Sequence, residues 1–450
     1  MKEFNFEKLP IVEIANEIIM DAVNKGASDI HFDPSQDSLK IRFRIDGILS
    51  DYSIIPSKYK RNMISRIKMI AGMNIMETRL PQDGAIKSKI GERFLDLRVS
   101  SLPTNNAEKI VIRILDYSMS LAGLDNLGFS EDAMEKINRL IKIPNGIILV
   151  TGATGTGKST TLYSILQKLN TEAVNIITVE DPVEMDIEGI NQVQTQSEIG
   201  LTFATILRSI LRQDPNIIMI GEIRDDETAR IAVRASITGH LVLSSLHTNN
   251  SLNTIERLTD MDVERYLLGS SLEGIISQRL ARKVCPECSI KRPTTDYERQ
   301  VFKTVLGKDV SEMVVANKEG CPKCTHGYKG RLAILEVLVM NEQIKDAITN
   351  GANKNTLREL VYTGDVVTLL QDGLNKVVLG ETTFEEILKI VDLENDMTQY
   401  NDDNLKTNLK MAQQAHKVDN KTNDKPITSN ITSEFKIEKT NNENIETVEF

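Results

Sequence analysis

The chain has 450 residues with 54 basic and 64 acidic side chains, and its formal net charge is −10. This acidic balance argues against a nucleic-acid partner that is held by bulk electrostatics, so we expect none. No apolar run approaches the roughly 20 residues that span a bilayer, and residues 1–8 lack the apolar segment of a secretory signal. We therefore expect a cytoplasmic protein of two or three domains.

Residues 1–115 show the pattern of an α+β domain. Apolar side chains recur at helical spacing over residues 11–22, and residues 39–48 alternate apolar and charged side chains like a half-buried strand. Asp46 and the glycine after it favour a hairpin turn, which indicates an antiparallel sheet. The weakly periodic residues 116–130 follow, and we expect them to form an interdomain linker.

From residue 131 the pattern changes to alternating strands and helices. Short apolar runs separated by helical stretches indicate a parallel sheet with helices on both faces. These runs lie at residues 147–150, 175–179, 217–220 and 241–246. Ligands bind such sheets beyond the carboxyl ends of the strands. We expect this α/β core to cover residues 131–280.

The first of these strands leads directly into a glycine-rich loop that matches the pattern G-x-x-x-x-G-K-[ST]. The glycines let successive backbone N–H groups point into one concavity, which binds phosphate at the N-terminus of the following helix. Lys158 would reach the β- and γ-phosphates, and the hydroxyl of Ser159 would bind Mg²⁺. The expected ATP-binding residues are Gly152, Ala153, Thr154, Gly155, Thr156, Gly157, Lys158, Ser159 and Thr160.

Each of the next three strands ends in ionisable side chains. Glu180 and Asp181 follow the second strand, Glu222 follows the third and His247 follows the fourth. Carboxylates beside Mg²⁺-ATP can deprotonate the attacking water or hold the metal through water. One acidic cluster alone is common as a helix cap, but ionisable side chains at three successive strand ends favour a hydrolytic site.

The cysteines of the chain form two C-x-x-C pairs, a spacing that can complete a tetrahedral zinc site. The expected zinc ligands are Cys285, Cys288, Cys321 and Cys324. His326 follows Cys324 closely, but four thiolates already fill the tetrahedron, so we do not expect it to bind the metal. The alternative to a zinc site is four reduced thiols without a metal. We expect a structural zinc element over residues 281–335, remote from hydrolysis.

Two regions complete the chain. Residues 336–395 carry an apolar stripe at helical spacing, so we expect a helical C-terminal subdomain. Residues 396–450 are polar with few large apolar side chains, a composition that cannot bury enough surface to offset the entropy of ordering. We expect these last residues to form a disordered tail.

Several motifs together resemble the ATPase family that powers type II secretion and type IV pilus assembly. The main matches are residues 152–160 to its Walker A motif, 177–184 to its Asp box, 211–225 to its atypical Walker B motif and 238–249 to its His box. Shorter matches lie at residues 29–31, 42–47, 82–84, 98–104, 113–115 and 278–280. The resemblance spans roughly residues 10–395.

This resemblance implies an architecture. The family has a RecA-like P-loop ATPase core, preceded by an α+β domain of PAS-like fold. The tetracysteine insertion resembles the extension and secretion branch, because pilus retraction ATPases lack it. Many extension ATPases carry a separate N1 domain that docks on inner-membrane partners, and we expect this protein to lack one before Ile11.

The resemblance also implies roles for single residues. Glu222 resembles the glutamate that activates water. Glu180 and Asp181 resemble the Asp-box acids that support the metal and the water. His247 resembles the group that senses the γ-phosphate.

Arg98 and Arg113 resemble the arginines that the N-terminal domain brings to the nucleotide. A mobile guanidinium can stabilise transition-state charge while it couples hydrolysis to domain motion. From the residues alone, a solvated strand face is the alternative.

As a whole, the resemblance implies an Mg²⁺-dependent homohexameric motor at the cytoplasmic face of the membrane. It would turn an inner-membrane platform protein so that pilins are lifted into a type IV pilus. A motor for type II secretion or a competence pseudopilus, acting on pseudopilins, would use the same residues. A non-hydrolysing scaffold is disfavoured because Glu222, Glu180 and His247 are all present, and a nucleic-acid translocase is disfavoured by the acidic charge.

Overall fold

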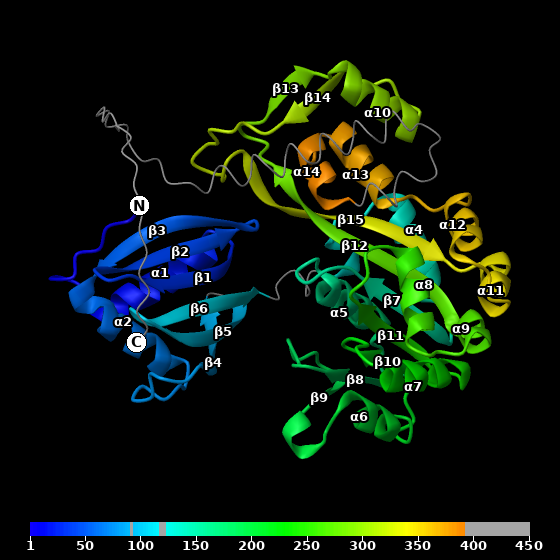
Figure 1. Ribbon diagram of the computed structural model, residues 1–450, viewed down its shortest axis with the longest axis horizontal. Coiled ribbons are helices and arrows are strands. Elements are labelled where there is room, and N and C mark those ends of the chain that lie inside the picture. The colour runs from blue at the N-terminus through cyan, green and yellow to red at the C-terminus, as the bar shows by residue number, and fades with distance from the viewer. Residues whose placement is uncertain (91–92, 117–122, 392–450) are drawn as a thin grey trace, which may run out of the picture.

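The computed structural model describes residues 1–90, 93–116 and 123–391. Residues 117–122 of the expected linker and the whole expected tail, 396–450, lie outside the described residues. Figure 1 shows an N-terminal body built on one sheet and a larger body built on a second sheet. The candidate site lies in a cleft whose walls come from both bodies.

The N-terminal body is a six-stranded antiparallel sheet with strand order β3-β2-β1-β6-β5-β4. Its elements are α1 (Ile11–Asn24), β1 (Ala27–Pro34), β2 (Ser38–Ile45), β3 (Ile48–Pro56), α2 (Ser57–Ile70), β4 (Gln82–Ile90), β5 (Arg93–Thr104) and β6 (Ala107–Asp116). Apolar side chains of both helices and of one sheet face form a single core, which includes Ile18, Phe43 and Ile67. The α+β fold expected here is confirmed.

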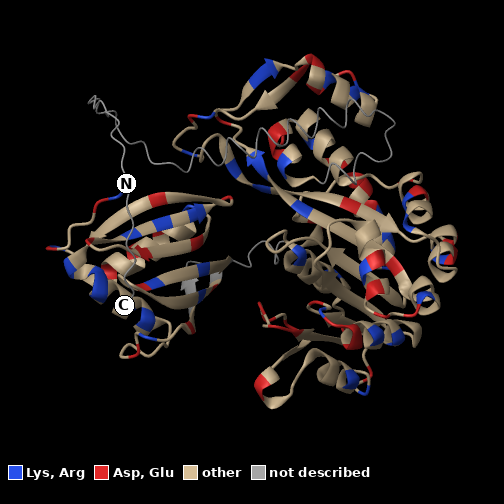
Figure 2. Cartoon of the chain, viewed as in Figure 1, with Lys and Arg blue, Asp and Glu red and all other residues tan. Residues whose placement is uncertain are grey.

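The alternation along β2 separates the two faces of this sheet. Ile41 and Phe43 are buried in the core, whereas Arg42 and Arg44 lie on the opposite face. On that face Nε of Arg42 lies 2.7 Å from Oδ2 of Asp33. The sheet therefore has one apolar face for its helices and one charged face, seen as blue and red segments along the strands in Figure 2.

The larger body is organised around a seven-stranded sheet with strand order β15-β12-β7-β11-β10-β8-β9. Its strands are β7 (Gly146–Thr151), β8 (Ile176–Glu180), β9 (Asn191–Gln194), β10 (Ile217–Ile220), β11 (Leu241–Leu246), β12 (Leu272–Val284) and β15 (Tyr328–Val339). The accompanying helices are η1 (Leu124–Asn126), α4 (Glu131–Leu140), α5 (Lys158–Leu169), η2 (Ser197–Ile199), α6 (Phe203–Ile210), α7 (Asp226–Ile237), α8 (Ser251–Asp260) and α9 (Arg265–Ser271). Two apolar clusters, each formed by strand and helix residues, hold the layers together.

Strand pairing in this sheet is parallel except at one edge. β12 joins β7 in parallel, but β15 pairs with β12 in the antiparallel sense. The parallel pairing expected for the strands of residues 147–246 is confirmed. The strand β15 was not predicted, and it is antiparallel because the chain returns directly beside β12 after the cysteine-bearing segment. The expected boundaries at residues 280 and 335 both fall inside these two strands.

The remaining elements of the larger body are the cysteine-bearing segment, which connects β12 to β15, and the C-terminal helices. The segment contains β13 (Ile290–Pro293), α10 (Asp296–Leu306) and β14 (Glu312–Val315). The helices are α11 (Glu342–Thr349), α12 (Lys354–Tyr362), α13 (Leu369–Val378) and α14 (Phe384–Ile390), so the expected helical C-terminal part is confirmed. Among the described residues, no helix combines the length and the apolar character that crossing a membrane requires.

Candidate functional site

The loop between β7 and α5 has a backbone geometry that glycine adopts most readily. Gly155 and Gly157 have φ angles of 79° and 87°, in the left-handed region. A Cβ on Gly157 would also lie only 2.8 Å from Nε2 of Gln278. Because α5 begins at the next residue, Lys158, the loop presents its N–H groups at a helix N-terminus, where phosphate binds readily.

Gln278 fastens this glycine loop to β12. Its Nε2 donates to the carbonyl oxygen of Thr156 at 2.8 Å, and its Oε1 accepts from the hydroxyl of Thr161 at 2.7 Å. The side chain is buried. No local pattern predicts this role for Gln278, because its contact with the loop depends on the neighbouring positions of β7 and β12 in the sheet.

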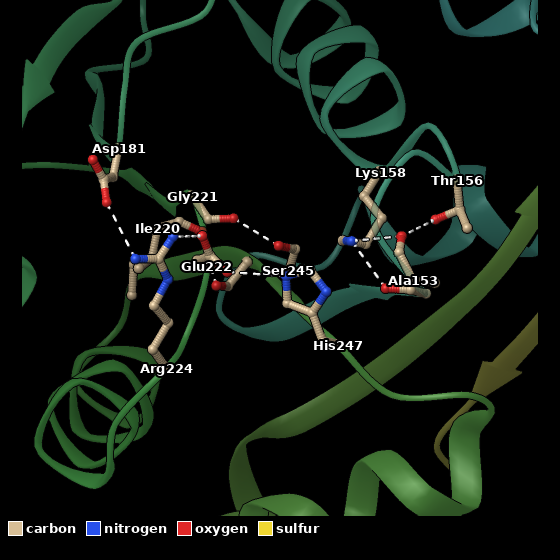
Figure 3. Close-up of polar contacts among 12 residues, drawn as sticks. Ala153, Thr156, Lys158, Asp181, Ile220, Gly221, Glu222, Arg224, Ser245 and His247 are labelled. Atoms are coloured by element: carbon tan, nitrogen blue, oxygen red, sulfur yellow. Dashed lines mark hydrogen bonds and ion pairs between the residues drawn. The ribbon is translucent and has the colours of Figure 1, made fainter. Parts of the chain in front are cut away.

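The ammonium of Lys158 is held by the loop itself. Its Nζ donates to the carbonyl oxygens of Gly152 at 2.9 Å and Ala153 at 3.1 Å, as Figure 3 shows. Burial lowers the pKa of Lys158, although the charge of Glu222 acts in the opposite direction. Phosphate oxygens are stronger acceptors for an ammonium than neutral carbonyls, so the loop is suited to exchange these contacts for a nucleotide.

Side chains from two neighbouring strand ends meet at Glu222. Glu222 follows β10 and His247 follows β11, and these strands pair in parallel. Oε2 of Glu222 lies 3.0 Å from Nε2 of His247, and Oε1 accepts a hydrogen bond from Nη2 of Arg224 at 2.5 Å. Figure 3 shows the three side chains facing one another. Glu222 and His247 are predicted site residues, whereas Arg224 was covered only by the Walker B match over residues 211–225.

Two opposing effects set the pKa of Glu222. Burial raises it, but the hydrogen bond and positive charge of Arg224, together with His247, outweigh burial, so the pKa lies below its ordinary value. The side chain keeps 19% of its surface exposed. Glu222 is therefore an accessible carboxylate at neutral pH, which is what a general base for water requires.

Asp181 lies beside this cluster. Its Oδ2 is 3.2 Å from Nη1 of Arg224, and its side chain is exposed. Arg224 therefore links Asp181 to Glu222 and holds two carboxylates close together at the sheet end.

Glu180 has different surroundings, because its side chain is buried. Its carboxylate accepts hydrogen bonds from the hydroxyl of Thr178 at 2.5 Å and from Nε2 of Gln192 at 3.0 Å. The hydroxyl of Tyr163, on α5, also donates to it. Burial together with the charge and hydrogen bond of Glu180 raises the pKa of Tyr163. Glu180 thus ties the helix after the glycine loop to the end of β8.

A cleft of about 1520 Å³ opens in front of these residues. Its walls include Lys158, Ser159, Glu222 and His247 from the larger body and Arg113 from the N-terminal sheet. Its volume exceeds the roughly 300–1,000 Å³ of typical ligand pockets, so a nucleotide and a metal ion can be accommodated.

The two predicted arginines differ in position. Arg98 on β5 and Arg113 on β6 are direct partners in register. Arg113 lines the cleft, and its Nε lies 3.2 Å from Oδ1 of Asp29. Arg98 lies outside the cleft lining, and its Nη2 is 2.9 Å from Oδ2 of Asp96. The structure thus brings one of the two arginines to the candidate site.

The four cysteine sulfurs lie in one cluster. Sγ of Cys285 is 3.9 Å from that of Cys321, Sγ of Cys288 is 3.6 Å from that of Cys324, and all four lie within 4.8 Å of one another. A tetrahedron with Zn–S bonds of about 2.3 Å has sulfurs about 3.8 Å apart, so the spacing fits zinc. We expected this element to be remote from hydrolysis, but Cys324 forms part of the cleft wall.

Known proteins share this combination of fold and motifs. Residues 5–389 match the family described as Type II/IV secretion system protein. The chain belongs to this family. It is 45% identical over 382 residues to the putative type II secretion system protein E of Escherichia coli (strain K12), covering 85% of this chain and 77% of the relative. It is also 45% identical over 381 residues to the type IV pilus assembly ATPase PilB of Myxococcus xanthus (strain DK1622), covering 84% of this chain and 67% of the relative.

Solved structures agree in fold. The ATPase DotB of Legionella pneumophila superposes with a TM-score of 0.62 at 21% identity, covering 86% of this chain and 97% of that chain. The pilus retraction motor PilT with bound ADP gives a TM-score of 0.52 at 25% identity, covering 88% of this chain and 98% of that chain. The expected family and the expected RecA-like α/β fold are confirmed. The names of the relatives include both type II secretion and type IV pilus assembly, so they do not favour pilus extension over secretion.

Proposed function

We propose that this secretion-family ATPase hydrolyses Mg²⁺-ATP in the cleft at the carboxyl ends of β7, β8, β10 and β11. The observation that carries the proposal is the position of Glu222, an ionised and partly exposed carboxylate held between His247 and Arg224. Lys158 and the loop N–H groups bind the phosphates, and Ser159 binds Mg²⁺, which would neutralise phosphate charge when bound.

Each group of the chain has a distinct role in this mechanism. Glu222 accepts the proton of the attacking water. His247 contacts Glu222 and senses whether the γ-phosphate is present. Asp181, exposed beside the same cluster, would hold the metal when it is bound. Lys158 stabilises the charge that spreads over the transferred phosphoryl group.

Two further groups act from outside this cluster. Glu180 is buried and accepts hydrogen bonds from Thr178, Gln192 and Tyr163, so its support of the metal and the water is indirect, through the position of the Asp181 backbone. Arg113 approaches the phosphates from the N-terminal sheet and stabilises transition-state charge. Arg98 would share this role only after leaving Asp96.

A zinc ion on the cysteine cluster would be structural. Four thiolates fill a tetrahedron and leave no open position for substrate or water. The ion would join the end of β12 to the start of β15, since Cys285 follows β12 directly and Cys324 lies just before β15. Its role would be to keep these two strand ends together.

We further propose that hydrolysis powers assembly of a pilus-like fibre. The protein would act as a homohexamer at the cytoplasmic face of the membrane and turn an inner-membrane platform protein. Pilins of a type IV pilus, or pseudopilins of a type II secretion or competence machine, would be lifted as a result. The family supports both machines equally. We propose no nucleic-acid partner, in keeping with the net charge of −10.

Phosphate release by the purified protein tests the site. Lys158→Ala and Glu222→Gln should abolish it, whereas the control Glu227→Gln should not, because Glu227 is exposed and pairs with Arg208. Equal rates in Lys158→Ala and unmodified protein would remove the basis of the proposal.

An experiment in cells tests which assembly machine the protein serves. The only copy of its gene in these cells carries Glu222→Gln. Loss of surface pili by electron microscopy, with the protein still present, would assign it to pilus extension. Normal pili with loss of protein secretion or DNA uptake would assign it to a pseudopilus machine.

A further inference from the structure

A row of buried polar side chains crosses the central sheet immediately before the glycine loop. Thr151 on β7, Ser277 on β12 and Glu336 on β15 are direct partners in register across three adjacent strands. Direct partners place their side chains on the same face of a sheet. Oγ1 of Thr151 lies 3.0 Å from Oγ of Ser277, and all three residues are 0% exposed.

The N-terminus of α8 lies against this row. Oγ of Ser251, the first residue of α8, is 3.4 Å from Oγ of Ser277. The backbone N–H of Ser251 donates to Oε1 of Glu336 at 2.9 Å. Asn250, the residue before the helix, caps it by accepting the N–H of Asn253 at 2.9 Å. The start of α8 therefore contacts β12, which carries Gln278, and β15 directly, and it is linked to β7, which leads into the glycine loop, through Ser277.

This anchor lies close to His247, which stands four positions before Ser251 in the chain. Residues 248–250, between His247 and Ser251, also contact β12, because Nη2 of Arg279 donates to the carbonyl oxygen of Asn249 at 2.8 Å. Leu246, the residue before His247, pairs with Thr151 in register. The loop that carries His247 is thus attached at both of its ends to elements of the polar row.

Glu336 is the member of this row whose burial is energetically least favourable. A buried carboxyl group is unfavourable unless it is well paired, and Oε2 of Glu336 has no hydrogen-bond partner among the described residues. Burial raises the pKa of Glu336, although the N–H of Ser251 and the charge of Arg279 act against this. Buried ionisable groups of this kind cluster at functional sites. The partner of Glu336 is the N-terminus of α8, through the N–H of Ser251.

We propose that Glu336 is a positioning residue for ATP hydrolysis, which holds the start of α8 and thereby fixes the His247 loop relative to the glycine loop. The proposal rests on the proposed function, because it needs His247 and Glu222 at the hydrolytic site. A displacement of about 1 Å at a supporting element can lower a rate by about 100-fold. Loss of the Glu336 anchor should therefore affect the chemical step more than nucleotide binding, which depends on the loop itself.

Two substitutions at one position separate this role from packing. Glu336→Gln keeps an acceptor oxygen for the N–H of Ser251, so kcat should stay within about 3-fold of the unmodified protein. Glu336→Leu removes the acceptor at similar volume, and kcat should fall at least about 10-fold, which equals about 1.4 kcal/mol. The dissociation constant of ADP should change by less than about 3-fold in both.

Asp372→Leu is the matched control. Asp372 is a buried carboxyl that accepts the N–H of Leu335, the neighbour of Glu336 on β15, and the ammonium of Lys376, both at 2.9 Å. This variant should lower the melting temperature and leave kcat per folded molecule unchanged, since its contacts lie away from α8.

Unchanged kcat in Glu336→Leu overturns the proposal. A loss of kcat in Glu336→Gln as large as that in Glu336→Leu also overturns it, because the amide keeps the acceptor oxygen. If Glu336→Leu does not fold, Thr151→Val interrupts the row at its other end. That variant should lower kcat about 3- to 10-fold with ADP affinity retained, and a normal kcat overturns the proposal. Failure of the proposed function would instead appear as equal phosphate release in unmodified protein and Lys158→Ala.

Discussion

Nε2 of His247 lies 3.0 Å from Oε2 of Glu222, so the ends of β10 and β11 are joined at the carboxylate that would activate water. Glu222→Gln keeps the shape of this side chain but removes its ability to accept a proton. We expect phosphate release to fall by at least about 100-fold. ADP affinity, measured by calorimetry, should change little, and a parallel loss of affinity would point to a folding defect instead.

Arg224 controls the ionisation of the same carboxylate. Burial raises the pKa of Glu222 and Arg224 is the main group that lowers it, so Arg224→Met should raise this pKa. In the unmodified protein Glu222 stays ionised until the pH falls through its pKa, which lies below the ordinary value for a glutamate. The stability that the carboxylate contributes is lost over the same pH range. The acid limb of the kcat/KM profile should therefore move to higher pH in Arg224→Met. Arg230→Met, at an exposed ion pair with Asp226, should leave the profile in place.

The glycine loop allows strain to be separated from steric clash. Gly155 and Gly157 both have positive φ, but a Cβ on Gly155 would meet no atom within 4 Å, whereas one on Gly157 would lie 2.8 Å from Nε2 of Gln278. Gly155→Ala should cost about 1–2 kcal/mol of stability by backbone strain. Gly157→Ala should cost more and also displace Gln278 from Thr156, so ATP affinity should fall at least about 10-fold further. Equal effects of the two substitutions in unfolding and binding assays would contradict this account.

The cysteine cluster predicts a metal content. Purified protein should contain about one zinc ion per chain, and the double variant Cys285→Ser, Cys288→Ser should contain none. Because β12 ends next to Cys285, we expect a lower melting temperature in the variant and in protein treated with a chelator. Elemental analysis with thermal unfolding checks both, and metal-free protein of unchanged stability would leave the cluster as four reduced thiols.

Arg113 and Arg98 give a matched pair on adjacent strands. Arg113 lines the cleft and Arg98 does not, so Arg113→Gln should reduce kcat by at least about 10-fold and more than Arg98→Gln does. Steady-state kinetics of both variants at saturating ATP gives the comparison. A larger effect of Arg98→Gln would mean that the two bodies take up a different arrangement during turnover.

Local patterns were sufficient for much of this molecule. The period-two alternation around Phe43 predicted the charged and apolar faces of β2, and the apolar run before Gly152 predicted the buried strand β7. These features depend on side chains that are near one another in the sequence, so their spacing carries the information. The strand ends with Glu222 and His247 were found in the same way.

Other features depend on contacts between distant segments. β4 was not predicted, because its residues show no clean alternation; it forms as the edge partner of β5. The antiparallel course of β15 follows from its pairing with β12, which no local pattern reveals. The same holds for the burial of Glu180 and for Gln278 beside the loop. Nothing in the spacing of Glu336 distinguishes it from a surface acid.

The strands β12 and β15 have a mechanical consequence. Their pairing is continuous from Gly274 beside Val339 to Arg282 beside Arg331, and after a register shift it ends with Val284 beside Tyr328. Gln278, which grips the phosphate loop, and Cys285, at the tip, are about 23 Å apart at the rise of an extended strand. The paired strands therefore connect the cysteine cluster to the phosphate loop through hydrogen-bonded backbone, so a displacement of the cluster would be transmitted to Gln278 along the sheet rather than through a loop.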